Sequence, residues 1–341
     1  MPVRMKDIAR DLNVSVVTVS KVLRNHTDIG AETRERVLKR IKELNYQPNL
    51  AARSLVTGRT YTIGLVVPDL VHPFFAQVAK GIVRRIRPKG YSLIIASAEE
   101  DTDLERQEIE HLLARQVDAL IVASTRSTPD VFERMEGQRT PLILIDRRFP
   151  SLKINYVGVD DDEIGYVATK HLIDIGRKRI AHIRGRDLSN GLGRLDGYHR
   201  ALVESGMVTP PEYVVEGRST DASGDVSGYN AMRQLLTASP QPDAVFCFND
   251  PTAMGAMKAI LEAGLRIPED IAVIGAGNLR YSDQLRVPLS TIDQSSDEMG
   301  ERAAKLALKA IESKSPLAPR KIILEPKLVV RESTVRPVQL S

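Results

Sequence analysis

The chain has 341 residues, 42% of them hydrophobic and 27% charged, and this composition is typical of a globular protein with two or three domains. The longest apolar runs, such as residues 271–277, have the length of a β-strand and exclude a membrane span. No apolar stretch follows the first residues, so we see no secretory signal and expect a cytoplasmic protein. The single cysteine, Cys247, lies in an apolar run and is expected to be a buried core residue.

The positive charge is concentrated near the N-terminus. Residues 1–60 contain 12 Lys and Arg against 6 Asp and Glu, whereas the remaining 281 residues contain 36 against 38. A basic segment attached to a nearly neutral body is the pattern of a nucleic-acid-binding domain joined to a second module. A solvated basic surface without a ligand would have the same composition, so charge alone does not decide between the two.

The basic segment contains three predicted helices. The first covers residues 6–12, residues 13–14 form a turn, and the second covers residues 16–23 with Ser15 as its N-cap. The third covers about residues 33–44. Their apolar spacing predicts a three-helix core that contains Ile8, Ala9, Leu12, Val19, Val22, Leu23, Val37, Leu38, Ile41 and Leu44.

The outward side of the second helix carries small groups and cations. The helical period leaves Val16, Val17, Ser20, Lys21 and Arg24 outside this core or at its edge. Two adjacent exposed valines at a helix start have no folding purpose, and they suit contacts with thymine methyl groups or base edges in the major groove of DNA. A helical bundle without a DNA role is the alternative, and the basic charge of the segment argues against it.

The segments KDIARDLNVSVVTVSKVL and ETRERVLKRIKELNYQPNLAARSL closely resemble the head and hinge of the LacI/GalR family of bacterial transcription regulators. The resemblance implies a helix-turn-helix head in residues 1–48, in which Val16, Val17 and Lys21 read bases. Gly30 departs from the family, where a serine is common, but glycine is an acceptable N-cap. The DNA-contacting residues expected from the resemblance are Lys6, Ser15, Val16, Val17, Thr18, Ser20, Lys21, Asn25, Tyr46, Asn49, Ala52, Arg53 and Leu55.

Residues 49–60 are predicted to form a hinge helix and a linker. The segment 49–56 is about two helical turns long, and so short a helix is unstable alone in water. The resemblance implies that it folds on operator DNA, where it pairs in the minor groove with its twin from a second subunit. Leu55 then lies where the family wedges a leucine between central base pairs and kinks the duplex. A plain core leucine is the alternative, which the surrounding linker disfavours.

From residue 62 the chain alternates apolar strand-like runs with amphipathic helices, which predicts an α/β fold of parallel sheets covered on both faces. The resemblance extends over residues 61–341 and implies the two-lobed fold of type I periplasmic binding proteins. We expect one lobe from about 61–160 plus 292–322, and the other from about 161–291 plus 323–341. The predicted strands are residues 63–67, 92–97, 119–124, 142–146, 180–185, 244–249 and 271–276, and predicted helices include residues 104–115, 164–175 and 251–263.

Polar and aromatic residues follow several of these strands, where open α/β sheets bind ligands. Aromatic rings with convergent Arg, Asp and Asn side chains suit a polyhydroxylated ligand, because the rings stack on its apolar face and the polar groups bind its hydroxyls. The resemblance implies that Arg194 contacts the effector, and it also matches Asp146, Asn249, Asp250 and Gln294 to effector positions. The predicted effector site is His72, Phe74, Phe75, Asp146, Arg147, Arg194, Asn249, Asp250, Asn278 and Gln294.

Three of these residues have a structural alternative. One of Phe74 and Phe75 is expected to pack in the core. Asp250 could cap the helix that follows it, either instead of binding the effector or in addition to binding it.

One departure from the family affects the charge of the site. Relatives commonly carry an acid that binds ligand hydroxyls where this chain has Gly277, while the predicted site keeps Arg147, Arg148 and Arg194. We therefore expect the effector to be a sugar or sugar derivative, with an anionic one such as a sugar acid or sugar phosphate as the specific hypothesis.

The predicted function is that of a sequence-specific DNA-binding transcriptional regulator, a repressor by resemblance, whose operator affinity is controlled allosterically by the effector between the lobes. It is expected to be a homodimer, since the chain ends soon after KLVVRES without a heptad array that would build a tetramer. No enzymatic activity, cofactor, metal or membrane partner is expected. The run IGAGNLR resembles a dinucleotide fingerprint, but Arg280 replaces its third glycine. A transport-type sugar-binding protein is the rival interpretation of the body alone, and the fused head argues against it.

Overall fold

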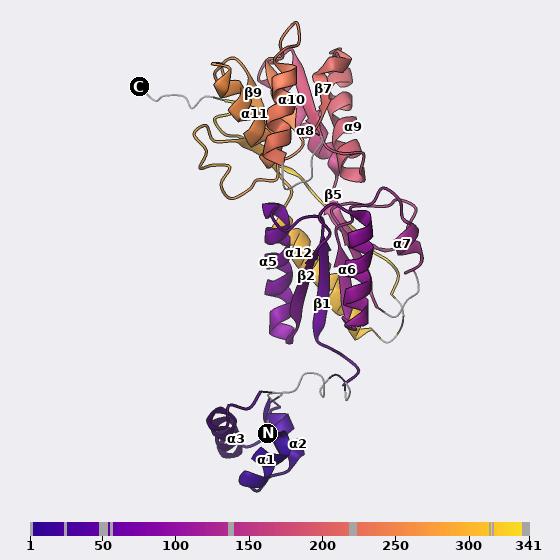
Figure 1. Ribbon diagram of the computed structural model, residues 1–341, viewed down its shortest axis with the longest axis vertical. Coiled ribbons are helices and arrows are strands. Elements are labelled where there is room, and N and C mark those ends of the chain that lie inside the picture. The colour runs from indigo at the N-terminus through magenta and orange to yellow at the C-terminus, as the bar shows by residue number, and fades with distance from the viewer. Residues whose placement is uncertain are drawn as a thin grey trace. The chain divides into compact units, whose positions relative to one another are not determined.

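The structure, a computed structural model, describes residues 3–23, 26–47, 54, 57–135, 140–217, 224–313, 315 and 317–335. The chain divides into two compact units, a head of residues 1–60 and a body of residues 61–341 (Figure 1). Within the described ranges, no helix is both long and apolar enough to cross a membrane.

The head is built from the three predicted helices, α1 (Met5–Asp11), α2 (Val16–Leu23) and α3 (Ala31–Glu43). Ile8, Val19 and Val37 are fully buried between them, which confirms the predicted core. Gly30 is the N-cap of α3, which begins at Ala31, two residues before the expected start of that helix. The prediction that Leu38 is buried is wrong, because the inner face of α3 is centred on Val37 and leaves Leu38 47% exposed.

The first sheet of the body is parallel throughout and has the order β11-β5-β4-β3-β1-β2. Helices α5 and α12 pack together on one face, and α6 and α7 pack on the other (Figure 1). We call this sheet and its helices the first lobe. Its elements are β1 (Thr62–Val67), α5 (Pro73–Ile86), the 3-10 helix η1 (Arg87–Lys89), β2 (Ser92–Ser97), α6 (Thr102–Ala114), β3 (Ala119–Val122), α7 (Asp130–Glu133), β4 (Leu142–Ile145), β5 (Asn155–Val159), α12 (Ser296–Glu312) and β11 (Lys321–Leu324).

The second sheet has the order β12-β10-β9-β8-β6-β7, and β12 alone of its described strands runs antiparallel to its neighbour. Helices α8 and α9 pack together on one face and α10 and α11 on the other. We call this the second lobe. Its elements are α8 (Asp161–Asp174), β6 (Ile180–Arg184), α9 (Ser189–Glu204), the 3-10 helix η2 (Pro211–Tyr213), β7 (Val214–Glu216), α10 (Gly224–Leu235), β8 (Ala244–Cys247), α11 (Asp250–Glu262), β9 (Ala272–Ala276), β10 (Ser290–Asp293) and β12 (Lys327–Val329).

The α/β architecture predicted from the sequence is therefore confirmed, and Cys247 is buried in β8 as expected. The chain passes between the two sheets after β5, after β10 and after β11. The second of these passages follows Asp293, slightly later than expected, and the third follows Leu324. Because the strands of each sheet are parallel apart from β12, their carboxyl ends and the loops that follow lie at one edge of the sheet.

Candidate functional sites

The exposed side of α2 carries two of the residues predicted to read bases. Val16 is 43% exposed and Val17 is 61% exposed, although the other valines of this helix are buried. The Ser15 hydroxyl accepts a hydrogen bond from the backbone N–H of Thr18 at 2.9 Å, which confirms the predicted cap. Branched apolar side chains gain nothing from exposure to water, so this small surface is suited to an apolar partner such as the thymine methyl group.

Lys21 is paired within the head. Its ammonium nitrogen lies 2.5 Å from a carboxylate oxygen of Asp28, and the two side chains are 35% and 53% exposed. The hydrogen bond from Lys21 lowers the pKa of Asp28 below its usual value. A contact between Lys21 and a base therefore requires this pair to be exchanged, and solvent screening makes so exposed a pair weak. No sequence pattern pointed to Asp28, which lies in the turn between α2 and α3.

The other predicted DNA contacts are placed as follows. Lys6 is exposed, whereas Thr18 and Ser20 are half-buried. Tyr46 is 9% exposed and packs in the head core, where burial raises its pKa, so its ring supports the fold. Outside the described residues lie Arg24, Asn25, Asn49, Ala52, Arg53 and Leu55.

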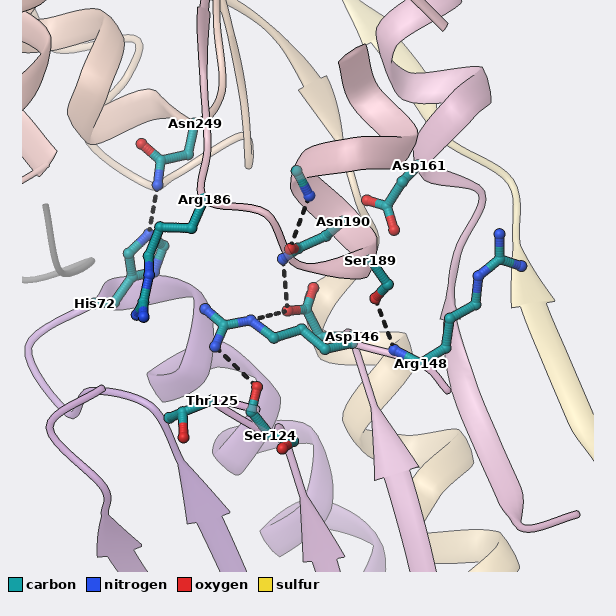
Figure 2. Close-up of polar contacts among 12 residues, drawn as sticks. His72, Ser124, Thr125, Asp146, Arg148, Asp161, Arg186, Ser189, Asn190 and Asn249 are labelled. Carbon is teal, nitrogen blue, oxygen red and sulfur yellow. Dashed lines mark hydrogen bonds and ion pairs between the residues drawn. The ribbon is translucent and has the colours of Figure 1, made fainter. Parts of the chain in front are cut away.

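In the body, polar side chains from the two lobes meet at the carboxyl ends of the strands. His72 is the N-cap of α5 and accepts a hydrogen bond from the backbone N–H of Phe74 at 3.2 Å. Its other ring nitrogen lies 3.4 Å from the amide nitrogen of Asn249, which follows β8. Figure 2 shows Asn249 and Asn190, from the second lobe, pointing toward His72 and Asp146 of the first.

Asp146 follows β4 and faces the start of α9. Its carboxylate accepts a hydrogen bond from the Asn190 amide at 3.2 Å, and the neighbouring backbone N–H of Arg148 donates to the Ser189 hydroxyl at 2.9 Å. The φ angle of Asp146 is 60°, a conformation uncommon for a residue other than glycine. The turn after β4 thus aims this carboxylate at the opposite lobe.

Glu100 holds two arginines that come from opposite lobes. Its carboxylate accepts hydrogen bonds from Arg147, which follows β4, at 3.1 Å and from Arg186, which follows β6, at 2.5 Å. Arg147 also donates to the backbone oxygen of Ser124 at 2.8 Å. The side chains of Glu100 and Arg147 are 3% and 5% exposed, so their ion pair is shielded from solvent.

A pocket that is open to solvent lies beside this ion pair and is lined by Glu100, Arg147 and Arg186 together with polar groups of the second lobe. In this arrangement of the lobes its cavity volume is about 20 Å³, room for about one water molecule and far below the ~300–1,000 Å³ typical of small-molecule sites. The Ser227 hydroxyl lines it, is 8% exposed and has no hydrogen-bond partner among the described residues. Buried hydroxyls rarely stay unpaired, so Ser227 is suited to bind a ligand or a water.

Arg194 is 2% exposed and is held on three sides. It donates to Asp161 at 3.1 Å, to the backbone oxygen of Phe248 at 2.7 Å and to Gln294 at 2.9 Å. Its guanidinium carbon also lies 4.5 Å from the centre of the Phe248 ring. Burial raises the pKa of Asp161 to about 7, although Arg194 acts to lower it. The predicted effector residues Arg194 and Gln294 therefore bind each other here, with Asp161 as a third member.

Asp250 is fully buried and orders the loop that follows β9. Its carboxylate accepts hydrogen bonds from the Thr291 hydroxyl at 2.6 Å, the Ser282 hydroxyl at 2.8 Å and the backbone N–H of Leu279 at 2.9 Å. The alternative that Asp250 caps the next helix is wrong, because the N-cap of α11 is Asn249, whose side chain accepts from the backbone N–H of Thr252.

The loop ordered by Asp250 contains Gly277 and Asn278. Gly277 has a φ of 143°, a conformation in which any side chain is strained. The backbone therefore favours glycine here over the acid that relatives commonly carry at this position. The Asn278 amide donates to Asp293 at 3.1 Å and accepts from Arg331 at 2.8 Å, so it is engaged within the second lobe.

Both phenylalanines after the first strand are core residues, whereas only one was expected to be. Phe74 and Phe75 are 4% and 3% exposed and pack edge to face, with ring centres 5.1 Å apart. Sequence reasoning missed Glu100, Arg186, Asn190, Phe248 and Ser227. Glu100 and Arg186 lie just beyond predicted strands and Phe248 lies near the end of the predicted strand 244–249, so a closer reading of the strand ends would have found these three. Asn190 lies in the first turn of α9, which also carries Arg194, so the expectation that Arg194 lies in a loop is wrong. Ser227 lies inside α10 and had no signal.

Two family models match the chain. Residues 4–49 match the model of bacterial regulatory proteins of the lacI family, and residues 60–330 match the model of periplasmic binding proteins and the sugar binding domain of the LacI family. The ribose operon repressor of Haemophilus influenzae is 38% identical and the transcriptional repressor PurR of Pasteurella multocida 35% identical, each over 96% of this chain and 98% of its own length.

Solved structures are similar over nearly the whole chain. A Lac repressor dimer bound to operator and the anti-inducer ONPF is 27% identical with a TM-score of 0.84, and the match covers 98% of this chain and all of that one. A complex of the transcriptional regulator CelR with cellobiose is 30% identical with a TM-score of 0.72, and the match covers 97% of this chain and 99% of that one.

Proposed function

This chain belongs to the LacI family of bacterial regulatory proteins, and we propose that it is a homodimeric repressor whose affinity for operator DNA is set by a small sugar-like effector bound between the lobes of the body. It is a DNA-binding transcriptional regulator rather than an enzyme. Residues 1–48 bind DNA, residues 49–60 form the hinge, and residues 61–341 bind the effector and the second subunit. As a regulator of genes the protein acts in the cytoplasm.

The proposed DNA contacts centre on Val16 and Val17, which are exposed at the start of α2, and on Lys21, which gives up its pair with Asp28. These side chains offer few hydrogen bonds to bases, so a good share of the specificity comes from the hinge, with Leu55 as the wedge, and from the spacing of two heads on a pseudo-palindrome. The edge strand β2 supports a dimer, because Ile94 and Ile95 on it are 36% and 40% exposed.

The contacts between the lobes are the observation that carries the effector proposal. His72 and Asn249, Asp146 and Asn190, and Glu100 and Arg186 pair across the two lobes at the strand ends where the sequence predicted a ligand. A polyol that exchanges its hydroxyls for some of these contacts changes the free energy of the closed arrangement of the lobes. Because the hinge precedes the first lobe in the chain, such a change alters whether the hinge helices order on DNA. A coupling of ~1–3 kcal/mol is typical of such systems. The relatives named for ribose and cellobiose support a sugar-like effector.

The test begins with the full-length protein and a library of random duplex DNA. We expect selection to yield a pseudo-palindromic site, with an affinity that falls steeply with salt because phosphate contacts contribute much of the binding. A panel of neutral and anionic sugars is then added to the complex with the selected duplex. Release or tightening by one class of sugar is expected, and a protein that binds sugars without any change in operator affinity would contradict the allosteric proposal.

The division of labour between head and body is tested by deleting residues 1–60. We expect operator binding to be lost, while the sugar identified above binds with unchanged affinity. Operator affinity that persists in the shortened protein would refute the assignment of the head.

A further inference from the structure

We propose that Arg147 and Arg186 together bind an anionic group of the effector, a carboxylate or phosphate on a polyol, in exchange for the Glu100 carboxylate that they now hold. The inference rests on the proposed function, because it assigns a chemical class to the effector of the same site. It also moves the expected anion contact away from Arg148 and Arg194, which sequence analysis had included.

The ion pairs of Glu100 bring cations from both lobes to one point. Two guanidinium groups share one carboxylate, and Glu100 is nearly inaccessible to solvent while the side chain of Arg186 is 40% exposed. Arginine presents a planar fork of donors that matches both carboxylate and phosphate. Two such forks converging from different lobes form a site for an anion, and Glu100 is the anion that the chain itself supplies.

The Glu100 carboxylate is placed by an uncommon backbone conformation. Its φ angle is 58°, and that of Glu99 is 49°, so two successive residues other than glycine adopt the left-handed region. Such conformations cost ~1–3 kcal/mol and are found more often at functional sites than elsewhere. The backbone of this turn therefore sets the direction in which the Glu100 carboxylate points.

Among the described residues, the other charged groups near the two arginines have partners of their own. Asp146 lies 3.8 Å from Arg147, but it also accepts the amide of Asn190. Arg184, which lines the same pocket, is paired with Asp187 and Glu216. The cations that Glu100 would release on exchange are therefore Arg147 and Arg186.

The rest of the pocket suits the hydroxyls of a polyol. Ser227 contributes a buried hydroxyl without a partner among the described residues, and Asn190, Asn249 and Thr252 contribute further polar groups. The present cavity of about 20 Å³ holds about one water molecule, so a ligand enters only as the Glu100 side chain moves away from the two arginines. Exchange would also break the direct link between Glu100 and Arg186 and rebuild it through the ligand, which ties anion binding to the contact between the lobes.

Inorganic phosphate is the first probe, and its dissociation constant is obtained from the thermal stability of the full-length protein at increasing phosphate concentration. E100Q removes the competing carboxylate, so phosphate should bind at least about tenfold more tightly than to the wild type. E99Q is the matched control, because it makes the same change in charge at the adjacent, exposed residue. The double variant E100Q/R186Q should lose the gain. Equal phosphate affinity in E100Q and E99Q would overturn the proposal.

Should E100Q fail to fold, R186Q keeps the test open, since it leaves the ion pair between Arg147 and Glu100 intact. Phosphate should then stabilise the wild type more than R186Q, and equal stabilisation would overturn the proposal.

Calorimetry with gluconate, ribose 5-phosphate, ribose and glucose identifies the source of the anion. We expect R186Q to weaken the binding of a sugar acid or a sugar phosphate about tenfold or more and that of neutral sugars less than twofold. Neutral sugars that release the operator while E100Q behaves like E99Q would refute the anion site and leave the proposed function standing. If E100Q confirms the phosphate site but no sugar changes the operator affinity, the anion site stands and the proposed function is refuted.

Discussion

The buried carboxylate of Asp250 should be among the most important single polar groups for the stability of the body. In Asp250→Ala the Thr291 and Ser282 hydroxyls and the backbone N–H of Leu279 lose their acceptor in a fully buried position. A buried donor without a partner costs ~1–3 kcal/mol. Partial relaxation of the loop reduces the sum, so we expect a loss of about 3–6 kcal/mol in the free energy of unfolding, a large share of the 5–15 kcal/mol typical of a domain.

Urea unfolding of the full-length protein, followed by far-ultraviolet circular dichroism, measures this loss. Asp250→Asn retains one acceptor oxygen and should lose less, about 1–3 kcal/mol. The matched control is Asp283→Ala, which removes an exposed carboxylate from the same loop and should change stability by less than about 0.5 kcal/mol. If the two alanine variants were equally stable, the argument that Asp250 acts by ordering the loop would be refuted, and its role would have to lie in contact with the effector.

Three further outcomes follow from the head and from the Arg194 network. Val17→Ala should weaken operator binding about fivefold, or ~1 kcal/mol, in a fluorescence anisotropy titration. The stability of the head should change by less than about 0.5 kcal/mol. An unchanged operator affinity would show that Val17 does not contact DNA. Asp28→Asn should release Lys21 and strengthen operator binding up to about fivefold, a gain that should vanish when Lys21 is also replaced by alanine. Burial raises the pKa of Asp161 in the folded protein to about 7, above the value of 3.8 in the unfolded chain. Between these two pH values the carboxyl group is protonated in the folded protein and ionised in the unfolded chain. The contribution of Asp161 to stability should therefore decline as pH rises from about 4 to about 7; Asp161→Asn should remove that decline in urea unfolding, and parallel pH profiles for the two proteins would contradict it.

The helices of the head and seven strands of the body could be predicted because they depend on local patterns. The inward spacing of Ile8, Val19 and Val37 and the cap at Ser15 are properties of neighbouring residues in the chain, and the structure confirms them. Leu38 shows the limit of such periodicity, since residues 37 and 38 point about 100° apart around the helix and only Val37 reaches the core.

The chemistry of the site was predictable in part. Residues after parallel strands must gather at one sheet edge, so Asp146, Arg147 and Asn249 were identified from their positions alone. Their partners were not, because Glu100 and Arg186 are 86 positions apart and lie in different lobes. The pairing of charges across such a separation depends on how two sheets face each other, which no local pattern encodes.

The sequence by itself determined the class of protein, the helices of the head, the two parallel sheets and the edge at which a ligand would bind, since periodicity, caps and strand ends are local. Tertiary structure alone decided which of the polar residues are occupied and which remain available to a ligand. It placed Asp250 in a buried loop network, joined Arg194 to Asp161, and left Arg147 and Arg186 sharing one carboxylate beside the pocket. The physical reason is that burial and charge pairing depend on every neighbour in space, and most of these neighbours are distant in the chain.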